Sequence, residues 1–275
     1  MGDGLISTAE GFRAAYRDVL GDIDALAGRI HGDDWDRPTG CPGWSVRDLV
    51  AHVADLESIL IGRDRPDHTV AGEPAHVRNM PGQFMEIGVD VRRTRPIDEV
   101  VAELHDVVAV RLRELEALDD DALDGDALGF FGPTKRRNQL TIRVFDLWSH
   151  DQDMRRALGD PGDLDGPAAA HSRELMVRGA ARRVQERLQP AAGTSVLVDI
   201  TGPGGARHGM TFDGQKGRGL SDLPGEPTVA LRLDLSTLTV LACGRADDPN
   251  ARDRVEIGGD VALGRRMLED IASTP

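Results

Sequence analysis

Residues 7–30 read STAEGFRAAYRDVLGDIDALAGRI. Large apolar side chains recur in this stretch at alternating spacings of four and three residues: Phe12, Tyr16, Val19, Ile23, Leu26 and Ile30. This spacing places all six on one face of an α-helix. Ser7 and Glu10 have the spacing of a capping box, so we expect Ser7 to begin the helix. A helix with one apolar face must bury that face against other elements, so we expect further elements with apolar faces that pack against it.

Further helices are predicted from similar stripes. We expect long helices over residues 45–60, 96–118 and 138–158 and a short one over residues 82–95. Ser45 with Asp48 marks the start of the first of these, and Gly159 followed by Pro161 marks the end of the third. Four long helices with one apolar face each favour a four-helix bundle.

Two segments between these helices carry polar residues, prolines and glycines. Residues 62–80 are expected to run over the surface of the bundle. The acidic sequence DDDALDGD at 119–126 is expected to be a solvated loop.

The pattern changes after residue 165. One more helix is expected over residues 168–188, and then stretches with two-residue alternation predict strands. The expected strands are 195–201, 207–212, 228–234 and 254–257, with helices over 236–243 and 261–271. We therefore predict an α+β protein with a helical bundle over residues 1–162 and a small α/β domain over residues 163–275.

Composition restricts the class of partner. The 275 residues include 47 acidic and 33 basic side chains, for a net charge of −14. Such a surface repels phosphate backbones and anionic lipid, so nucleic-acid and membrane partners are not expected. We expect no signal peptide, because the first residues lack a basic region followed by an apolar stretch, and no membrane span, because no apolar run is long enough to cross a bilayer. The cysteines are Cys41 and Cys243. We expect a cytoplasmic protein in which both cysteines have structural roles.

The residues suited to chemistry lie on two of the predicted helices. His52 falls three residues after Leu49 and four before Leu56, and so shares their inward face. Asp146 and His150 are four residues apart on another helix, as in metal sites built inside helical bundles. Together these side chains offer two imidazoles and one carboxylate, and three protein ligands leave a coordination position open for a substrate.

Each of these residues also has an ordinary structural interpretation. An inward histidine is commonly a core residue, and an Asp and a His four residues apart commonly form an exposed helix pair. We expect Asp146 to face inward because Ile142 lies one turn before it. Asp153, three residues after His150, either orients that imidazole or faces solvent. His105 is expected at the rim of the bundle.

Several segments resemble a known family. The sequences CPGWSVRDLVAHVADLE (41–57) and RVFDLWSHDQDMRRALG (143–159), followed by Pro161-Gly162, are similar to the two signature segments of the mycothiol-dependent maleylpyruvate isomerase-like family. This family belongs to the DinB-like metalloenzyme superfamily. LSTLTVLACGRADD (235–248) and RVEIGGDVALGRRMLEDI (254–271) resemble its C-terminal pattern, so the resemblance covers nearly the whole chain.

The resemblance implies an N-terminal four-helix bundle with a divalent metal, generally zinc, and a C-terminal domain of sterol-carrier-like character. By position it implies that His52, Asp146 and His150 are the metal ligands. The chain departs from the isomerase pattern at Asp146, where that pattern has glutamate. Because aspartate is one methylene shorter, the helix must approach the metal more closely or the carboxylate must bind through one oxygen.

The implied co-substrate is mycothiol, with a small electrophilic molecule as its partner. A zinc-bound thiolate adds to an electrophilic carbon, and the outcome is S-transfer or cis–trans isomerisation. The departure at Asp146 favours transfer. A metal-dependent hydrolase and a non-catalytic binder of lipid or another small molecule are the alternatives. Arg92, Arg93, Arg143 and Arg155 are candidates for substrate binding, and the chain is expected to be a monomer or homodimer.

Overall fold

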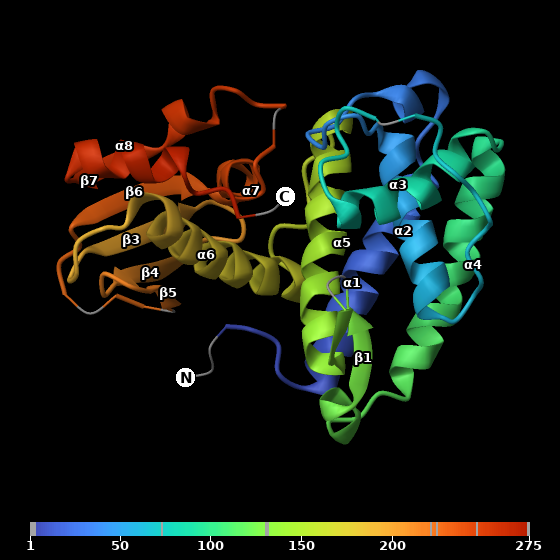
Figure 1. Ribbon diagram of the computed structural model, residues 1–275, viewed down its shortest axis with the longest axis horizontal. Coiled ribbons are helices and arrows are strands. Elements are labelled where there is room, and N and C mark those ends of the chain that lie inside the picture. The colour runs from blue at the N-terminus through green and yellow to red at the C-terminus, as the bar shows by residue number, and fades with distance from the viewer. Residues whose placement is uncertain are drawn as a thin grey trace. The chain divides into compact units, whose positions relative to one another are not determined.

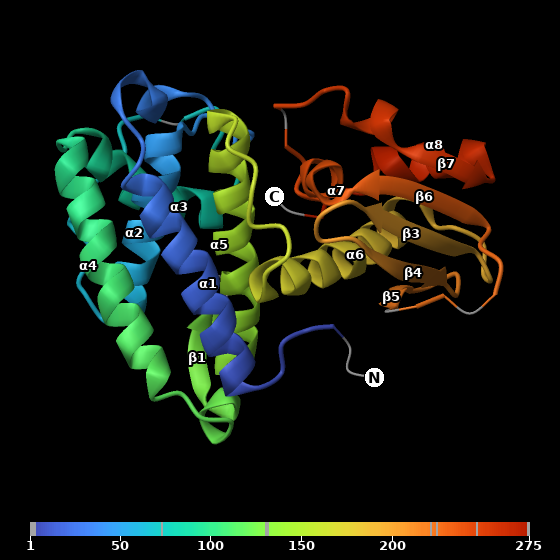
Figure 2. The ribbon, with the colours of Figure 1, turned by 180° about the vertical axis from the view of Figure 1, so that it is seen from behind.

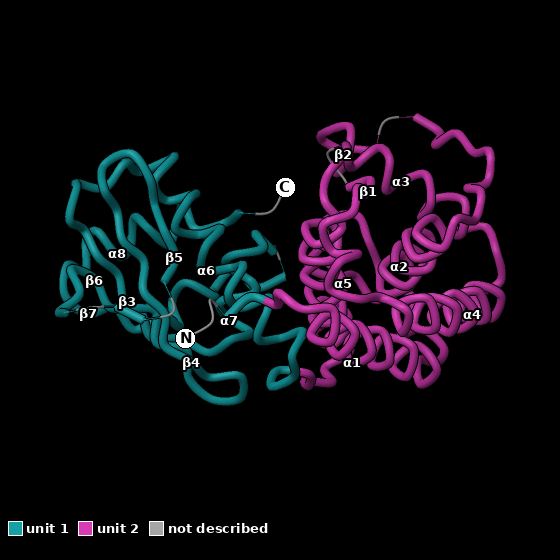
Figure 3. Tube along the Cα trace, turned by 90° about the horizontal axis from the view of Figure 1, so that it is seen from below, with its two compact units in different colours: residues 1–5, 164–275 teal, residues 6–163 magenta. Residues whose placement is uncertain are grey.

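The computed structural model describes residues 4–72, 74–129, 132–220, 222–223, 225–245 and 247–273. Two compact units make up the chain (Figure 3). The helical unit comprises residues 6–163, and the second unit comprises the described residues from 164 onward together with Gly4 and Leu5. The architecture is α+β, as predicted.

The helical unit is a bundle of four long helices with one shorter helix (Figure 1). The long helices are α1 (Ala9–Ala27), α2 (Val46–Leu60), α4 (Ile97–Glu116) and α5 (Arg136–Leu158), and the shorter one is α3 (Met80–Arg93). Helix α1 packs between α4 and α5, as the reverse view shows (Figure 2). Helix α2 packs against α3, α4 and α5. The four-helix bundle predicted from the apolar stripes is confirmed.

Side-chain caps determine where the helices begin. Ser45 and Asp48 form the predicted capping box at the start of α2. At α1 the prediction is wrong by one residue, because Thr8 and not Ser7 caps the helix, accepting a hydrogen bond from the Gly11 N–H. Helix α5 ends as predicted at Gly159, which adopts the left-handed conformation with φ 69°.

The segment before α5 is more ordered than the sequence predicted. Residues 119–126 are not simply a solvated loop, because a 3-10 helix, η2 (Asp121–Asp124), buries Leu123 completely. A short antiparallel hairpin of β1 (Asp126–Gly129) and β2 (Gly132–Lys135) then leads into α5. On the other side of the bundle, η1 (Gly32–Asp36) buries Trp35 and packs against α2.

The second unit is a five-stranded sheet of order β5-β4-β3-β6-β7. Its elements are α6 (Pro167–Leu188), β3 (Ser195–Thr201), β4 (Ala206–Phe212), β5 (Gly217–Leu220), β6 (Val229–Asp234), α7 (Leu235–Ala242), η3 (Ala251–Arg254), β7 (Glu256–Gly259) and α8 (Val261–Glu269). Strand β3 pairs in parallel with β6 and antiparallel with β4. Strand β5 was not predicted, and the strand predicted over 254–257 lies two residues later, after η3.

One face of this sheet is buried beneath helices. The register aligns Val196 with Val229 and Val198 with Leu231, and all four side chains are buried. Helix α6 packs against β4 and β5, and α8 packs against β6 and β7 (Figure 1). Alternate residues such as Arg232 point to the exposed face. No helix of the described part of the chain has both the length and the apolar character that a membrane crossing needs.

Candidate metal centre

His52 occupies the middle of α2 and is 3% exposed. The capping box at Ser45 sets the start of the helix. His52 lies on the same inward face as the buried residues Leu49 and Leu56, as the sequence predicted. Burial disfavours the imidazolium and lowers the pKa of His52 to about 4, although Asp146 opposes that change. His52 is therefore neutral at physiological pH, the form in which an imidazole binds a metal.

Helix α5 brings Asp146 and His150 to the same place. Nε2 of His150 lies 3.4 Å from Oδ1 of Asp146, and Nε2 of His52 lies 3.3 Å from Oδ2 of the same carboxylate. The structure therefore brings together the three residues that the sequence proposed as ligands. Their donor atoms all lie within 4.8 Å of one another.

These separations fit a metal ion. Donor atoms around a tetrahedral zinc at bond lengths of about 2.0–2.2 Å lie about 3.3–3.6 Å apart. The 3.4 Å between Oδ1 of Asp146 and Nε2 of His150 falls in that range, and Nε2 of His52 lies 3.3 Å from the other oxygen of the same carboxylate. Two imidazole nitrogens and one carboxylate oxygen are also a donor set typical of catalytic zinc.

The carboxylate of Asp146 lies at the mouth of this cluster and not inside the core. Its side chain is 23% exposed, and Ile142, one turn earlier, is 41% exposed. The reason given for an inward Asp146 is therefore wrong, because Ile142 itself faces solvent on α5. The cluster is consequently open on the Asp146 side.

Opposite charges stabilise the ionised forms of two of these groups. Burial alone raises the pKa of Asp146, but His150 and Arg143 outweigh burial and hold it well below its usual range. Burial alone lowers the pKa of His150, but Asp146 and Cys41 outweigh burial and hold that pKa well above its usual range. Without a cation at the centre, Asp146 and His150 form an ion pair.

The second nitrogen of His150 has its own partners. Nδ1 lies 3.2 Å from Oδ2 of Asp153 and 3.7 Å from Sγ of Cys41, and the thiol donates to the same Asp153 oxygen over 3.1 Å. Asp153 is fully buried and does not face solvent. The sequence alone predicts only a structural role for Cys41. Its place at the start of the CPGW segment, beside the predicted ligand helix, is the signal that could have pointed to this contact.

Trp44 forms an aromatic wall beside the cluster and was not predicted. Its ring centroid lies 5.0 Å from that of His52 and 6.1 Å from that of His150. The indole N–H donates to Oε2 of Glu86 on α3 over 2.8 Å. Because Trp44 is only partly buried, its ring has a side from which a bound molecule could approach.

Most of the candidate substrate-binding arginines are already paired within the bundle. Arg92 contacts Asp55 and Glu103, and Arg93 contacts Asp48 and Glu86. Arg155 pairs with Asp151 on its own helix. Arg143 differs from these three, because its guanidinium contacts Asp146 directly.

The remaining candidates lie away from the cluster. His105 is 75% exposed and pairs with Asp24, so its expected place at the rim is confirmed. Cys243 is buried at the end of α7 in the second unit.

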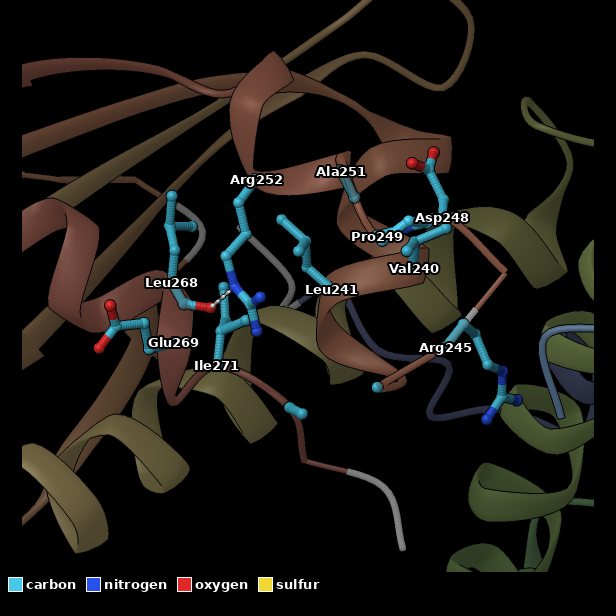
Figure 4. Close-up of a pocket in the computed structure, with 12 residues that line it drawn as sticks. Val240, Leu241, Arg245, Asp248, Pro249, Ala251, Arg252, Leu268, Glu269 and Ile271 are labelled. Carbon is cyan, nitrogen blue, oxygen red and sulfur yellow. Dashed lines mark hydrogen bonds between the residues drawn. The ribbon is translucent and has the colours of Figure 1, made fainter. Parts of the chain in front are cut away.

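The second unit contains a cavity of about 140 Å³ between the end of α7, η3 and the end of α8 (Figure 4). Leu241, Ile271 and Leu268 form its apolar lining, and Arg252 extends into it while donating to the Leu268 carbonyl. This cavity contains no histidine or cysteine among its lining residues. Two arginines, Arg245 and Arg252, and two acids, Asp248 and Glu269, also line this cavity, so its lining is mixed and not purely apolar.

Comparisons with protein families identify both units. Residues 16–155 match the model of the mycothiol maleylpyruvate isomerase N-terminal domain. Residues 162–269 match the model of the SCP-2 sterol transfer family. The first match includes His52, Asp146 and His150.

Two curated proteins are similar in sequence. Both are described as uncharacterized proteins of Mycobacterium tuberculosis, one from strain CDC 1551 / Oshkosh and one from strain ATCC 25618 / H37Rv. Each is 26% identical to this chain over 199 residues, which cover 70% of this chain and 74% of the relative.

Two solved structures are similar in fold. They are crystal structures of the mycothiol-dependent maleylpyruvate isomerase, one of a histidine-to-alanine mutant with a TM-score of 0.56 and one with a TM-score of 0.54. Both are 16% identical to this chain, and the alignments cover 92% of this chain and 94% of each of those chains. At this identity the likeness establishes a shared fold.

Proposed function

Because the chain belongs to the family defined by the mycothiol maleylpyruvate isomerase N-terminal domain, we propose that it is a metal-dependent enzyme with mycothiol as its co-substrate. The observation that carries this proposal is the convergence of His52, Asp146 and His150 on one cluster, with the Asp146 side chain partly exposed. These residues are the proposed metal ligands, and zinc is the proposed metal. Such an ion would supply a thiolate at neutral pH, where a free thiol with a pKa of about 8.5 is mostly protonated.

The protein's residues prepare the site for that role. Burial keeps His52 neutral, so no proton has to leave it before it binds. Asp153 faces Nδ1 of His150, which leaves Nε2 directed toward Asp146. Trp44 limits the space beside the two imidazoles and provides an apolar surface for part of the substrate.

The proposed reaction is addition of the mycothiol sulfur to an electrophilic carbon of a small molecule. If the sulfur remains attached, the product is a mycothiol conjugate; if the adduct rotates and expels the thiol, the product is a cis–trans isomer. Transfer is the proposed outcome, because Asp146 stands where the isomerase pattern has glutamate. The proposed setting is the cytoplasm, with the chain as a monomer or homodimer.

The test combines metal analysis with an assay of thiol dependence. We expect about one equivalent of zinc per chain and turnover of an electrophile panel only when mycothiol is present. Glutathione and bacillithiol serve as control thiols, and chelation should abolish activity. Equal conjugate formation by the chelated enzyme would contradict the proposal, and metal-dependent turnover without any thiol would indicate a hydrolase.

The match of the second unit to the SCP-2 sterol transfer family favours a second candidate function, the binding of an apolar ligand. The cavity in Figure 4 is small for this purpose, because its volume of about 140 Å³ is below the roughly 300 Å³ at which pockets for drug-sized ligands begin. A larger hollow of about 390 Å³ beside α8 has four charged residues among the eight that line it. Native mass spectrometry that finds a co-purified lipid would support this candidate.

A further inference from the structure

Arg143 connects the proposed metal centre to a buried chain of charges. Its side chain is 1% exposed, and its Nε donates to Oε1 of Glu57 over 2.8 Å. Its Nη1 contacts Oδ2 of Asp146. Glu57 is also fully buried, and its other oxygen lies 3.2 Å from Nε of Arg111. The charges therefore alternate along Arg111, Glu57, Arg143 and Asp146, which is the arrangement that buried ions require.

The two oxygens of Asp146 have different surroundings. Oδ2 contacts Nη1 of Arg143 and lies 3.3 Å from Nε2 of His52. Oδ1 lies 3.4 Å from Nε2 of His150. A guanidinium N–H that donates to one oxygen uses a lone pair of that oxygen and makes it a weaker ligand for a cation than the other oxygen. Oδ1 is the oxygen left to bind a cation.

We infer that Arg143 is a positioning residue that restricts Asp146 to one metal-binding oxygen. This inference rests on the proposed function, because it concerns the same metal centre. Three ligand atoms on a tetrahedral ion leave one position for a thiol, whereas a carboxylate bound through both oxygens would occupy that position. Glu57 balances the charge of Arg143 in the buried chain, and a glutamine at position 57 still offers an oxygen to Nε of Arg143.

Two double variants separate this role from a general effect on stability. Glu57→Gln with Arg143→Leu removes the group that contacts Asp146, and Glu57→Gln with Arg111→Leu is the matched control. Each removes one acid and one arginine from the same buried chain, so neither leaves the partner glutamate charged and unpaired. Thermal unfolding of the metal-free proteins establishes that both are folded.

The readout is the visible spectrum of bound cobalt(II), which absorbs strongly with four ligands and weakly with five or six. We expect strong bands for the unmodified protein and for the Arg111 variant, and loss of the strong bands for the Arg143 variant. Mycothiol should change the spectrum of the first two proteins and leave that of the Arg143 variant nearly unchanged. Strong bands in the Arg143 variant, or weak bands in both variants, would overturn the inference.

A second pair of variants covers the case in which the first pair does not fold, and the cobalt content of the unmodified protein tests the metal centre itself. If the Arg143 double variant does not fold, Arg143→Lys is compared with Arg111→Lys, because a lysine keeps the charge but cannot hold Glu57 and Asp146 together as a guanidinium does. The same loss of strong bands is then expected at Arg143 only. If the unmodified protein binds no cobalt, the proposed metal centre itself fails, whereas a bound and unchanged spectrum in the Arg143 variant refutes only the role of Arg143.

Discussion

The indole N–H of Trp44 donates to Oε2 of Glu86 over 2.8 Å, so a carboxylate on α3 orients the ring that lies beside the proposed metal ligands. Glu86 is 1% exposed and also receives hydrogen bonds from His76 and Arg93. Burial alone would raise the pKa of Glu86, but these hydrogen bonds hold it below the usual range. The Trp44 ring is therefore held in place by the ionised carboxylate of Glu86 inside the protein.

Replacing Trp44 should weaken substrate binding more than metal binding. We expect Trp44→Ala to raise KM by about 2- to 10-fold, the equivalent of one lost aromatic contact, while zinc content stays near one equivalent. Steady-state kinetics and elemental analysis measure the two effects. Trp35→Phe is the control, because Trp35 lies in η1 against α2 and should leave KM unchanged. An unchanged KM in Trp44→Ala would show that substrate does not contact this wall.

Removing one proposed ligand should release the metal without unfolding the bundle. We expect His150→Ala to lose its zinc, because two ligands hold the ion much less tightly than three. Helix α5 keeps buried Leu140, Val144 and Leu147, so its circular dichroism should match that of the unmodified protein. His105→Ala, at the exposed rim, should keep a full equivalent of zinc. A full equivalent in His150→Ala would remove that residue from the ligand set.

Asp153 should strengthen zinc binding through its contact with His150 and not by binding the metal itself. An asparagine keeps the shape of the side chain but loses the charge that faces Nδ1 of His150, so we expect Asp153→Asn to weaken zinc binding by about 10- to 100-fold. Competition with a chromophoric chelator measures the affinity. Asp160→Asn is the control, because Asp160 pairs with Arg29 on the surface beyond the end of α5. Equal affinities for the two variants would argue against this role.

The bundle was predictable because local spacing carries most of the information about it. The apolar stripe of α1 is buried as its spacing indicates, from Phe12 to Leu26. The two strands of the β1–β2 hairpin have only four residues each, too few for alternation to identify them. Strand β5 was missed for a different reason. A Cβ on its Gly217 would lie 2.0 Å from the Ala181 carbonyl oxygen, so only glycine allows the strand to pack this closely against α6. In the sequence alone, such a glycine indicates a turn and not a strand.

The proposed ligands were predictable in part. The four-residue spacing of Asp146 and His150 and the inward position of His52 are local patterns, and both lead to the cluster. Asp153 and Arg143 each lie three residues from the ligand that they contact, whereas Glu57 reaches Arg143 over 86 positions in the sequence. A buried ion pair of this kind has no local signature, because each charge alone indicates an exposed position.

Asp163 follows α5 and faces a group of carboxylates that the sequence did not single out. Burial together with the charges of Asp151, Asp18 and Asp22 raises the pKa of Asp163 to about 8, and burial raises that of Asp151 to about 6. The backbone of Asp163 is left-handed, with φ 52°, a conformation in which asparagine is among the favoured residues. Asparagine is therefore a fitting replacement that cannot ionise.

The raised pKa of Asp163 makes the helical unit less stable as pH increases. The unfolded carboxyl has a pKa near 3.8, so between about pH 4 and 8 the folded state binds more protons than the unfolded state, and the free energy of unfolding falls as pH rises through that window. Asp163→Asn removes this loss. We expect the Tm of the metal-free variant to exceed that of the unmodified protein at pH 8.5 and to depend less on pH between 5 and 8.5. Asp64→Asn, at an exposed position, should retain the slope of the unmodified protein, and an unchanged slope in Asp163→Asn would show that this carboxyl is already ionised in the folded state.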